Sequence, residues 1–104
     1  MLDFIKKLFS KAPETDFASL VRNGAVIVDV RTADEFKSGH IKGALNIPVD
    51  QIPSHTEGLR KKGKPVITCC RTGSRSGIAR TILTAAGIEC HNGGPWDVLR
   101  NRIE

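Results

Sequence analysis

Two nearly continuous runs of apolar, β-branched residues constrain the fold of this chain more than any other feature. Residues 25–30 read Ala-Val-Ile-Val-Asp-Val, and residues 65–69 read Pro-Val-Ile-Thr-Cys. A strand with one face in water alternates apolar and polar side chains, whereas these runs do not alternate. Both are therefore predicted to be strands that are buried on both faces, which is typical of a parallel sheet between two layers of helices.

Segments of helical character alternate with these strands along the chain. The predicted helices cover residues 17–21, 33–37, 50–62 and 78–86, with a last helix beginning at Pro95, and two shorter strands cover residues 44–47 and 88–91, before a turn at Gly93-Gly94. Such alternation favours the α/β class with right-handed crossovers. We expect a small three-layer domain whose central, mostly parallel sheet of about four to five strands is flanked by helices.

The length of the chain permits one domain. It has 104 residues, of which 39% are hydrophobic and 26% are charged, as is usual for a globular protein. We expect the domain to cover residues 14–104, after an amphipathic helix or extension at residues 1–13. Residues 1–11 are too few for stable interfacial anchoring, so we expect no membrane contact from them. The chain has no apolar run of membrane-spanning length and no pattern of a signal peptide, which predicts a cytoplasmic location.

The net charge of +5 arises from 16 basic and 11 acidic residues. Surfaces that bind nucleic acid interleave basic with aromatic residues, and this chain has one Trp and no Tyr. The basic run at residues 60–64 is interpreted as a solvated helix end before a turn. The basic excess suits the attraction of a small anionic substrate, and we expect no nucleic-acid partner.

The three cysteines indicate thiol chemistry and not a disulfide framework. Cys69 and Cys70 are adjacent, so their Cα atoms lie about 3.8 Å apart, whereas ordinary disulfides need roughly 4.4–6.8 Å. An odd number of cysteines that includes a neighbouring pair does not suit a secreted scaffold. One of these thiols is therefore expected to be present for its reactivity.

The loop after residues 65–69 carries the predicted chemistry. It connects a buried strand to a helix start, the edge at which α/β sheets bind ligands. Backbone N–H groups of a tight turn and the positive end of a helix dipole would make this exposed cradle favour an anion. The residues expected to bind the substrate are Arg71, Thr72, Gly73, Ser74 and Arg75.

Cys70 opens this cradle and is the predicted nucleophile. A free Cys has a pKa near 8.5, so only a small fraction is thiolate at neutral pH. Lowering the pKa by about two units needs about 2.7 kcal/mol of differential stabilisation. Several oriented N–H groups and a nearby Arg75 supply stabilisation of this size.

Several motifs occur together in one order along the chain. They are Val28-Asp29-Val30-Arg31, Glu35-Phe36, Gly39-His40-Ile41-Lys42-Gly43-Ala44, Asn46-Ile47-Pro48, Cys70-Arg71-Thr72-Gly73-Ser74-Arg75-Ser76 and Gly93-Gly94. With these motifs at this spacing, over roughly residues 15–98, the chain resembles the rhodanese-homology domain, which is a sulfurtransferase domain.

The resemblance implies a rhodanese-like fold and a sulfurtransferase in which Cys70 accepts the sulfur. In the family, the thiolate attacks the sulfane sulfur of a donor such as thiosulfate, releases sulfite and is left as a cysteine persulfide, from which cyanide or a thiol takes the sulfur. The implied partners are a small anionic donor, either thiosulfate or a persulfide, and a thiol or cyanide acceptor; a sulfur-accepting protein is a further candidate. Arg71 and Arg75 would attract the donor. No metal or organic cofactor is implied.

Four further motif residues are predicted to be structural: Asp29, Arg31, Glu35 and His40. The resemblance implies that the first three tie a strand to a helix. His40 is expected to fix a turn by hydrogen bonding, because a thiolate that its loop already stabilises has little need of a general base. A departure from the family lies at residues 11–14, a poor strand that predicts a vestigial fifth strand.

Two alternative functions are also compatible with the sequence. Cys69-x5-Arg75 has the spacing of the cysteine phosphatase signature, so a phosphatase or an arsenate reductase could use Cys69 as its nucleophile. Thr68 argues against this alternative, because it replaces the His that commonly precedes that nucleophile. The second alternative is a non-catalytic binding module with the same fold, although inactive relatives usually lack the loop cysteine.

Overall fold

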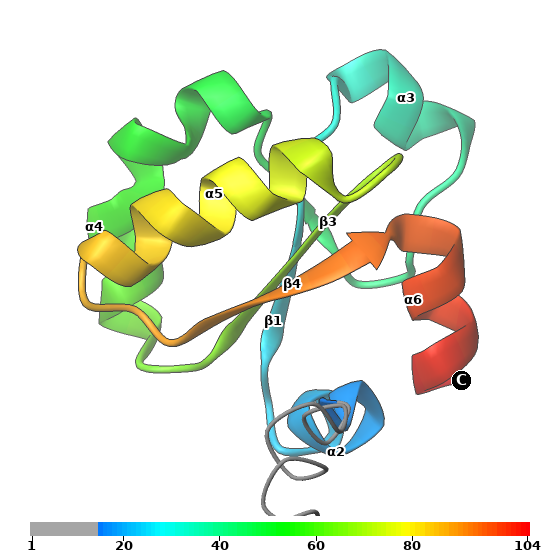
Figure 1. Cartoon of the computed structure of the whole chain (residues 1–104), viewed down its shortest axis with the longest axis horizontal. Helices are drawn as coiled ribbons and strands as arrows, with labels where there is room; N and C mark the ends of the chain where they lie inside the picture. The colour runs from blue at the N-terminus through cyan, green and yellow to red at the C-terminus, as the bar shows by residue number, and fades with distance from the viewer. Residues whose placement is uncertain (1–14) are drawn as a thin grey trace, which may run out of the picture.

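The computed structural model describes residues 15–104, so the amphipathic helix or extension predicted at residues 1–13 lies outside the described residues (Figure 1). The helices are α2 (Phe17–Arg22), α3 (Ala33–Ser38), the 3₁₀ helix η1 (Val49–Gln51), α4 (Ile52–Lys62), α5 (Ser74–Ala85) and α6 (Trp96–Ile103). The strands are β1 (Val26–Asp29), β2 (Leu45–Asn46), β3 (Val66–Cys70) and β4 (Cys90–Pro95).

The four strands form one parallel sheet in the order β2-β1-β3-β4. The two β-branched runs become its central strands β1 and β3, in which every residue from Ile27 to Asp29 and from Val66 to Cys70 is buried. The predicted α/β class with a parallel sheet is therefore confirmed. The vestigial fifth strand predicted at residues 11–14 lies outside the described residues.

The sheet has a layer of helices on each side. Figure 1 shows α4 and α5 on one side and α2 and α6 on the other. The core on the α4–α5 side contains Val28, Val66, Leu59, Ala79 and Leu83, together with further buried residues. The core on the α2–α6 side contains Phe17, Ile27, Ile67 and Leu99. Residues next to each other on β1 or β3 thus belong to different cores, as the alternation of side chains along a strand requires.

Strand β4 differs from the predicted strand at residues 88–91. It extends to Pro95 and includes Gly93 and Gly94, which were expected to form a turn. A Cβ atom on Gly93 would lie 2.8 Å from Leu99 Cδ2 and 2.9 Å from both Ile67 Cγ2 and the Thr68 carbonyl oxygen. Glycine is therefore needed at position 93 because β4 passes very close to β3 and α6, whereas Gly94 has a positive φ of 77° that a side chain would resist.

The helix start at α3 brings a carboxylate to the edge of the sheet that carries the loop. Thr32 caps α3 by accepting a hydrogen bond from the backbone N–H of Glu35, and the Glu35 carboxylate accepts one from the backbone N–H of Thr32. This reciprocal capping box fixes the Glu35 side chain at the first turn of α3.

In residues 15–104, no helix combines the length and the apolar character that crossing a membrane requires.

Candidate active site

The loop between β3 and α5 forms the centre of the candidate site. Strand β3 ends at Cys70, and α5 begins at Ser74 after a positive φ of 97° at Gly73. An L side chain would be strained at this φ, so glycine permits the sharp passage from strand to helix. Arg71, Thr72 and Ser74 are exposed on this loop, and the backbone N–H of Ser74 donates to Thr72 Oγ1 at 3.4 Å.

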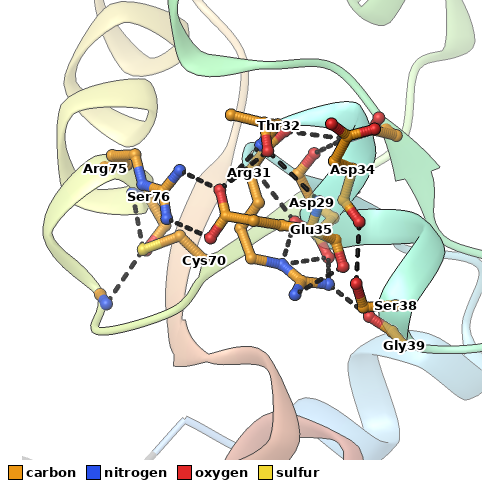
Figure 2. Close-up of polar contacts among 12 residues, drawn as sticks. Asp29, Arg31, Thr32, Asp34, Glu35, Ser38, Gly39, Cys70, Arg75 and Ser76 are labelled. Carbon is orange, nitrogen blue, oxygen red and sulfur yellow. Dashed lines mark hydrogen bonds and ion pairs between the residues drawn. The ribbon is translucent and has the colours of Figure 1, made fainter.

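The sulfur of Cys70 accepts hydrogen bonds from the loop and from the first turn of α5. The backbone N–H groups of Gly73 and Ser76 donate to Sγ at 3.0 and 3.4 Å, and Ser76 Oγ lies 3.4 Å from the same sulfur. Figure 2 shows these contacts on one side of the sulfur. Several donors that converge on one sulfur favour its charged form, because each bond is stronger to a thiolate than to a thiol.

The polar contacts of Cys70 outweigh its burial. Burial alone would raise the pKa of this thiol, but hydrogen bonds from the Ser76 hydroxyl and from the backbone N–H groups of Ser76, Gly73 and Thr72 lower the pKa below its ordinary value. The side chain has 0% exposure and also belongs to the core on the α4–α5 side. The expected cradle is therefore closed over the sulfur and not exposed, so a donor has to displace neighbouring atoms to reach it.

Cys69 lies in the opposite core, with Phe17, Ile67 and Leu99. Burial, and next the nearby charge of Asp29, raise the pKa of Cys69 to about 12. The structure therefore gives the phosphatase alternative no support, because that alternative needs Cys69 as a thiolate. Cys90, at the start of β4, is also buried, and burial raises its pKa to about 11.

The guanidinium of Arg75 is paired with the carboxylate of Glu35. Its two terminal nitrogens donate to the two carboxylate oxygens of Glu35 at 2.7 and 3.0 Å. This fork lowers the pKa of Glu35 to about 2, with the hydrogen bond from Arg75 as the largest cause and the bond from the Thr32 backbone as the next. The guanidinium of Arg75, which was expected to attract the donor, is thus engaged by a carboxylate that the capping box holds in place.

Asp29 and Arg31 form a buried ion pair beside the loop. Arg31 Nη2 donates to Asp29 Oδ2 at 2.7 Å, and both Nη groups also donate to backbone carbonyls, those of Glu35 and Gly39. The Arg31 guanidinium stacks on Trp96, with Cζ 4.7 Å from the ring centroid. Through these contacts the side chain joins the end of β1 to both ends of α3, as Figure 2 shows.

His40 lies outside the group of residues that contact the sulfur. Its Nδ1 lies 2.7 Å from the Phe36 carbonyl oxygen, so this nitrogen carries the proton and donates it. The ring stacks on that of Phe36 at a centroid distance of 3.7 Å.

Among residues 15–104, no group of three or more His, Cys, Asp or Glu side chains is arranged to hold a metal ion.

Two polar residues at the site were not among the predicted site residues. Ser76 is the last residue of the loop motif, and it supplies both a backbone and a side-chain contact to the sulfur. Asn92, on β4, accepts a hydrogen bond from Ser76 Oγ at 2.7 Å. The motif signals Ser76 through its place after Arg75, whereas nothing local in the sequence signals Asn92.

Comparison with known proteins gives a consistent result. A family model described as "Rhodanese-like domain" matches residues 14–94. The uncharacterized protein YqhL of Bacillus subtilis is 35% identical over 82 residues, which cover 79% of this chain and 64% of that protein. A "putative thiosulfate sulfurtransferase, mitochondrial" of Schizosaccharomyces pombe is 37% identical over 90 residues, which cover 75% of this chain and 59% of that protein.

Solved structures agree with the fold. The crystal structure of a rhodanese-like domain protein from Staphylococcus aureus has a TM-score of 0.65 at 29% identity, covering 93% of this chain and 83% of that one. The chain spans between about half and two thirds of the length of the first curated relatives that it matches.

Proposed function

This chain belongs to the family of rhodanese-like domains, and from that premise we propose that it is a sulfurtransferase with Cys70 as the sulfur-accepting nucleophile. The observation that carries the proposal is the convergence of the Gly73 N–H, the Ser76 N–H and the Ser76 hydroxyl on one sulfur. These groups favour a thiolate, which is the nucleophilic form of cysteine.

The proposed reaction proceeds in two steps. The Cys70 thiolate attacks the outer sulfur of thiosulfate, a sulfur–sulfur bond forms, and sulfite leaves with the electron pair of the bond that breaks. Cyanide or a thiolate then attacks the outer sulfur of the persulfide and takes it, which regenerates the Cys70 thiolate. The N–H groups of the loop stabilise the thiolate as nucleophile in the first step and as leaving group in the second.

Two features support a small anionic donor. Arg71 is exposed beside the buried sulfur and can attract an anion. The complete burial of Cys70 favours a donor of few atoms, because a larger donor has to displace more of the loop. Thiosulfate or a small persulfide meets both conditions, with cyanide, a thiol or the thiol of an accepting protein as acceptor.

The proposed domain covers residues 14–104, and a cytoplasmic location stays a prediction.

Intact-protein mass after incubation with thiosulfate tests the proposal. We expect a gain of one sulfur atom that cyanide or dithiothreitol removes, with release of thiocyanate in the cyanide reaction. Cys70→Ser should show no gain, whereas Cys69→Ser, the matched control one residue away, should gain sulfur like the unsubstituted protein. A stable protein that gains no sulfur from thiosulfate, glutathione persulfide or polysulfide would instead be a non-catalytic binding module. Uptake that requires Cys69 would reverse the assignment.

A further inference from the structure

The side chain of Asn92 on β4 makes three hydrogen bonds, two of which connect this strand to the sulfur loop and to α5. Its Nδ2 donates to the Gly73 carbonyl at 3.1 Å, and its Oδ1 accepts from Ser76 Oγ at 2.7 Å and from the Gly94 N–H at 2.9 Å. A carbonyl needs a donor and an N–H needs an acceptor, so only one orientation of the amide group satisfies both glycines. Oδ1 must therefore face Ser76.

The hydroxyl group of Ser76 has one proton and two possible acceptors. Asn92 Oδ1 lies 2.7 Å from Ser76 Oγ, and Cys70 Sγ lies 3.4 Å from it. While Cys70 is a thiol, its S–H can donate to Ser76 Oγ, and the hydroxyl proton can point to Asn92. When Cys70 is a thiolate, the sulfur has no proton to donate, and a hydroxyl that turns toward it makes a charge-assisted hydrogen bond.

The side chain of Asn92 stays hydrogen-bonded when the Ser76 hydroxyl turns toward the sulfur. Its Oδ1 keeps the hydrogen bond from the Gly94 N–H, so this oxygen is not left without a donor when the hydroxyl turns away. Ser76 is fully buried, which excludes water as a competing partner for its hydroxyl group. The atoms Sγ, Oγ and Oδ1 thus form a hydrogen-bonded chain. Rotation of the Ser76 hydroxyl moves its hydrogen bond from Asn92 Oδ1 to Cys70 Sγ.

We propose that Asn92 is a positioning residue that competes with the Cys70 sulfur for the hydroxyl proton of Ser76. The Ser76 hydroxyl donates to Oδ1 while Cys70 is a thiol or a persulfide, and it donates to Sγ instead when Cys70 is a thiolate. The inference rests on the proposed function, in which Cys70 alternates between a thiolate and a persulfide and returns to the thiolate once per cycle. The step is a rotation about the Cβ–Oγ bond of Ser76, so no covalent bond breaks and no co-reactant is needed.

The charged groups near the sulfur do not perform this role. Arg75 on α5 and Glu35 on α3 are paired with each other, and Asp29 on β1 is paired with Arg31. Cys69, on β3 itself, remains a neutral thiol near pH 7 because burial raises its pKa to about 12. These groups keep the same charge in variants of Ser76 and Asn92, so their effect cancels in a double-mutant cycle.

The cycle compares the unsubstituted protein, Asn92→Ala, Ser76→Ala and the double variant. The pKa of Cys70 is measured in each from the pH dependence of its alkylation by iodoacetamide, with circular dichroism as the check of folding. Asn92→Ala removes both the competition for the proton and the anchor on Gly73, whereas in the Ser76→Ala background it removes the anchor alone. We expect the change in the pKa of Cys70 that Asn92→Ala causes to be more negative in the unsubstituted background than in the Ser76→Ala background, by about 0.5 to 1 unit. Equal shifts, or a difference of opposite sign, would overturn the proposal.

A measurement on the unsubstituted protein decides the question if a variant does not fold. The side-chain carbonyl ¹³C resonance of Asn92 should shift as Cys70 ionises, because Oδ1 then loses one of its two donors. Ser76→Ala keeps the same thiolate charge and should abolish this shift, whereas a shift that is absent in the unsubstituted protein or persists in Ser76→Ala overturns the proposal. Neither measurement uses a sulfur donor, so its failure is distinguishable from a failure of sulfur uptake.

Discussion

Cys69 and Cys70 are neighbours on one strand, but their sulfur atoms lie in different surroundings. Cys69 contacts the core on the α2–α6 side, where burial and Asp29 raise its pKa to about 12. Cys70 is just as inaccessible, yet hydrogen bonds from the loop and α5 lower its pKa. Burial alone therefore does not set the pKa of these two thiols, because hydrogen-bond donors that face the Cys70 sulfur outweigh the effect of its burial.

Position within the strand explains the difference. Alternation along β3 sends the two side chains to opposite faces of the sheet. Only Cys70 is the last residue of the strand, where the chain turns back over the sheet edge and its N–H groups are not used by the ladder. A cysteine one position earlier has neither the loop nor the helix start above it.

Selective alkylation tests this comparison with the largest expected effect. Near pH 7.5, the thiolate fraction of Cys70 should exceed that of Cys69 by at least roughly a thousandfold, because their pKa values lie on opposite sides of the ordinary value. Iodoacetamide should therefore modify Cys70 long before Cys69 or Cys90, as fragment-ion mass spectrometry can resolve. Equal rates at the two neighbouring cysteines in the folded protein would remove the basis of the assignment.

The surroundings of Cys69 should matter for stability and not for sulfur chemistry. Asp29→Asn leaves the buried guanidinium of Arg31 without its counter-charge, and we expect a loss of about 3 kcal/mol in the free energy of unfolding. Urea denaturation measures this loss, and Glu57→Gln is the control because its ion pair with Arg60 is exposed. The rate of Cys70 alkylation in folded Asp29→Asn should stay nearly unchanged; a large change would mean that the two environments are coupled.

The parts of the fold that depend on local signals could be predicted from the sequence. The β-branched runs predict β1 and β3, and the residues after Thr32 predict the start of α3. The predicted strand at residues 88–91 overlaps β4, but the extension of β4 to Pro95 could not be predicted, because a glycine pair locally favours a turn. What decides it is the close approach of Gly93 to Leu99 and Ile67, a tertiary contact that the local sequence does not encode.

The same limit applies to the candidate site. The identity of Cys70 and the need for Gly73 follow from the strand–loop–helix pattern. The engagement of Arg75 by Glu35, by contrast, joins residues 40 positions apart, and no periodicity or spacing predicts it. The sequence therefore predicts which residues gather at the sheet edge but not how their charges pair.

Removing one donor should reduce the difference between the two thiols. Ser76→Ala deletes the hydroxyl that faces Cys70 Sγ, and we expect the pKa of Cys70 to rise by up to about one unit. The thiolate fraction and the rate of sulfur uptake near pH 7 should fall by about tenfold or less. Thr81→Val is the matched control, since it removes a hydroxyl from the same helix whose partner is the Gly77 carbonyl. An unchanged pKa in Ser76→Ala would show that the backbone donors alone determine the state of the sulfur.

The smallest expected effect separates the sulfur cradle from the ion pair beside it. The pKa of Glu35 in the folded protein is about 2, below the value of about 4.3 expected in the unfolded chain. The carboxylate therefore stabilises the fold above about pH 5, and this contribution is lost as the pH falls toward 2. The difference in urea midpoint between the unsubstituted protein and Glu35→Gln should be constant from pH 5 to 7 and shrink below pH 4. Alkylation of Cys70 should change by less than about threefold in Glu35→Gln, because the groups that donate to its sulfur come from the loop and α5 and not from α3. A larger change would mean that the Glu35–Arg75 pair, and not the backbone of the loop, keeps the cradle in place.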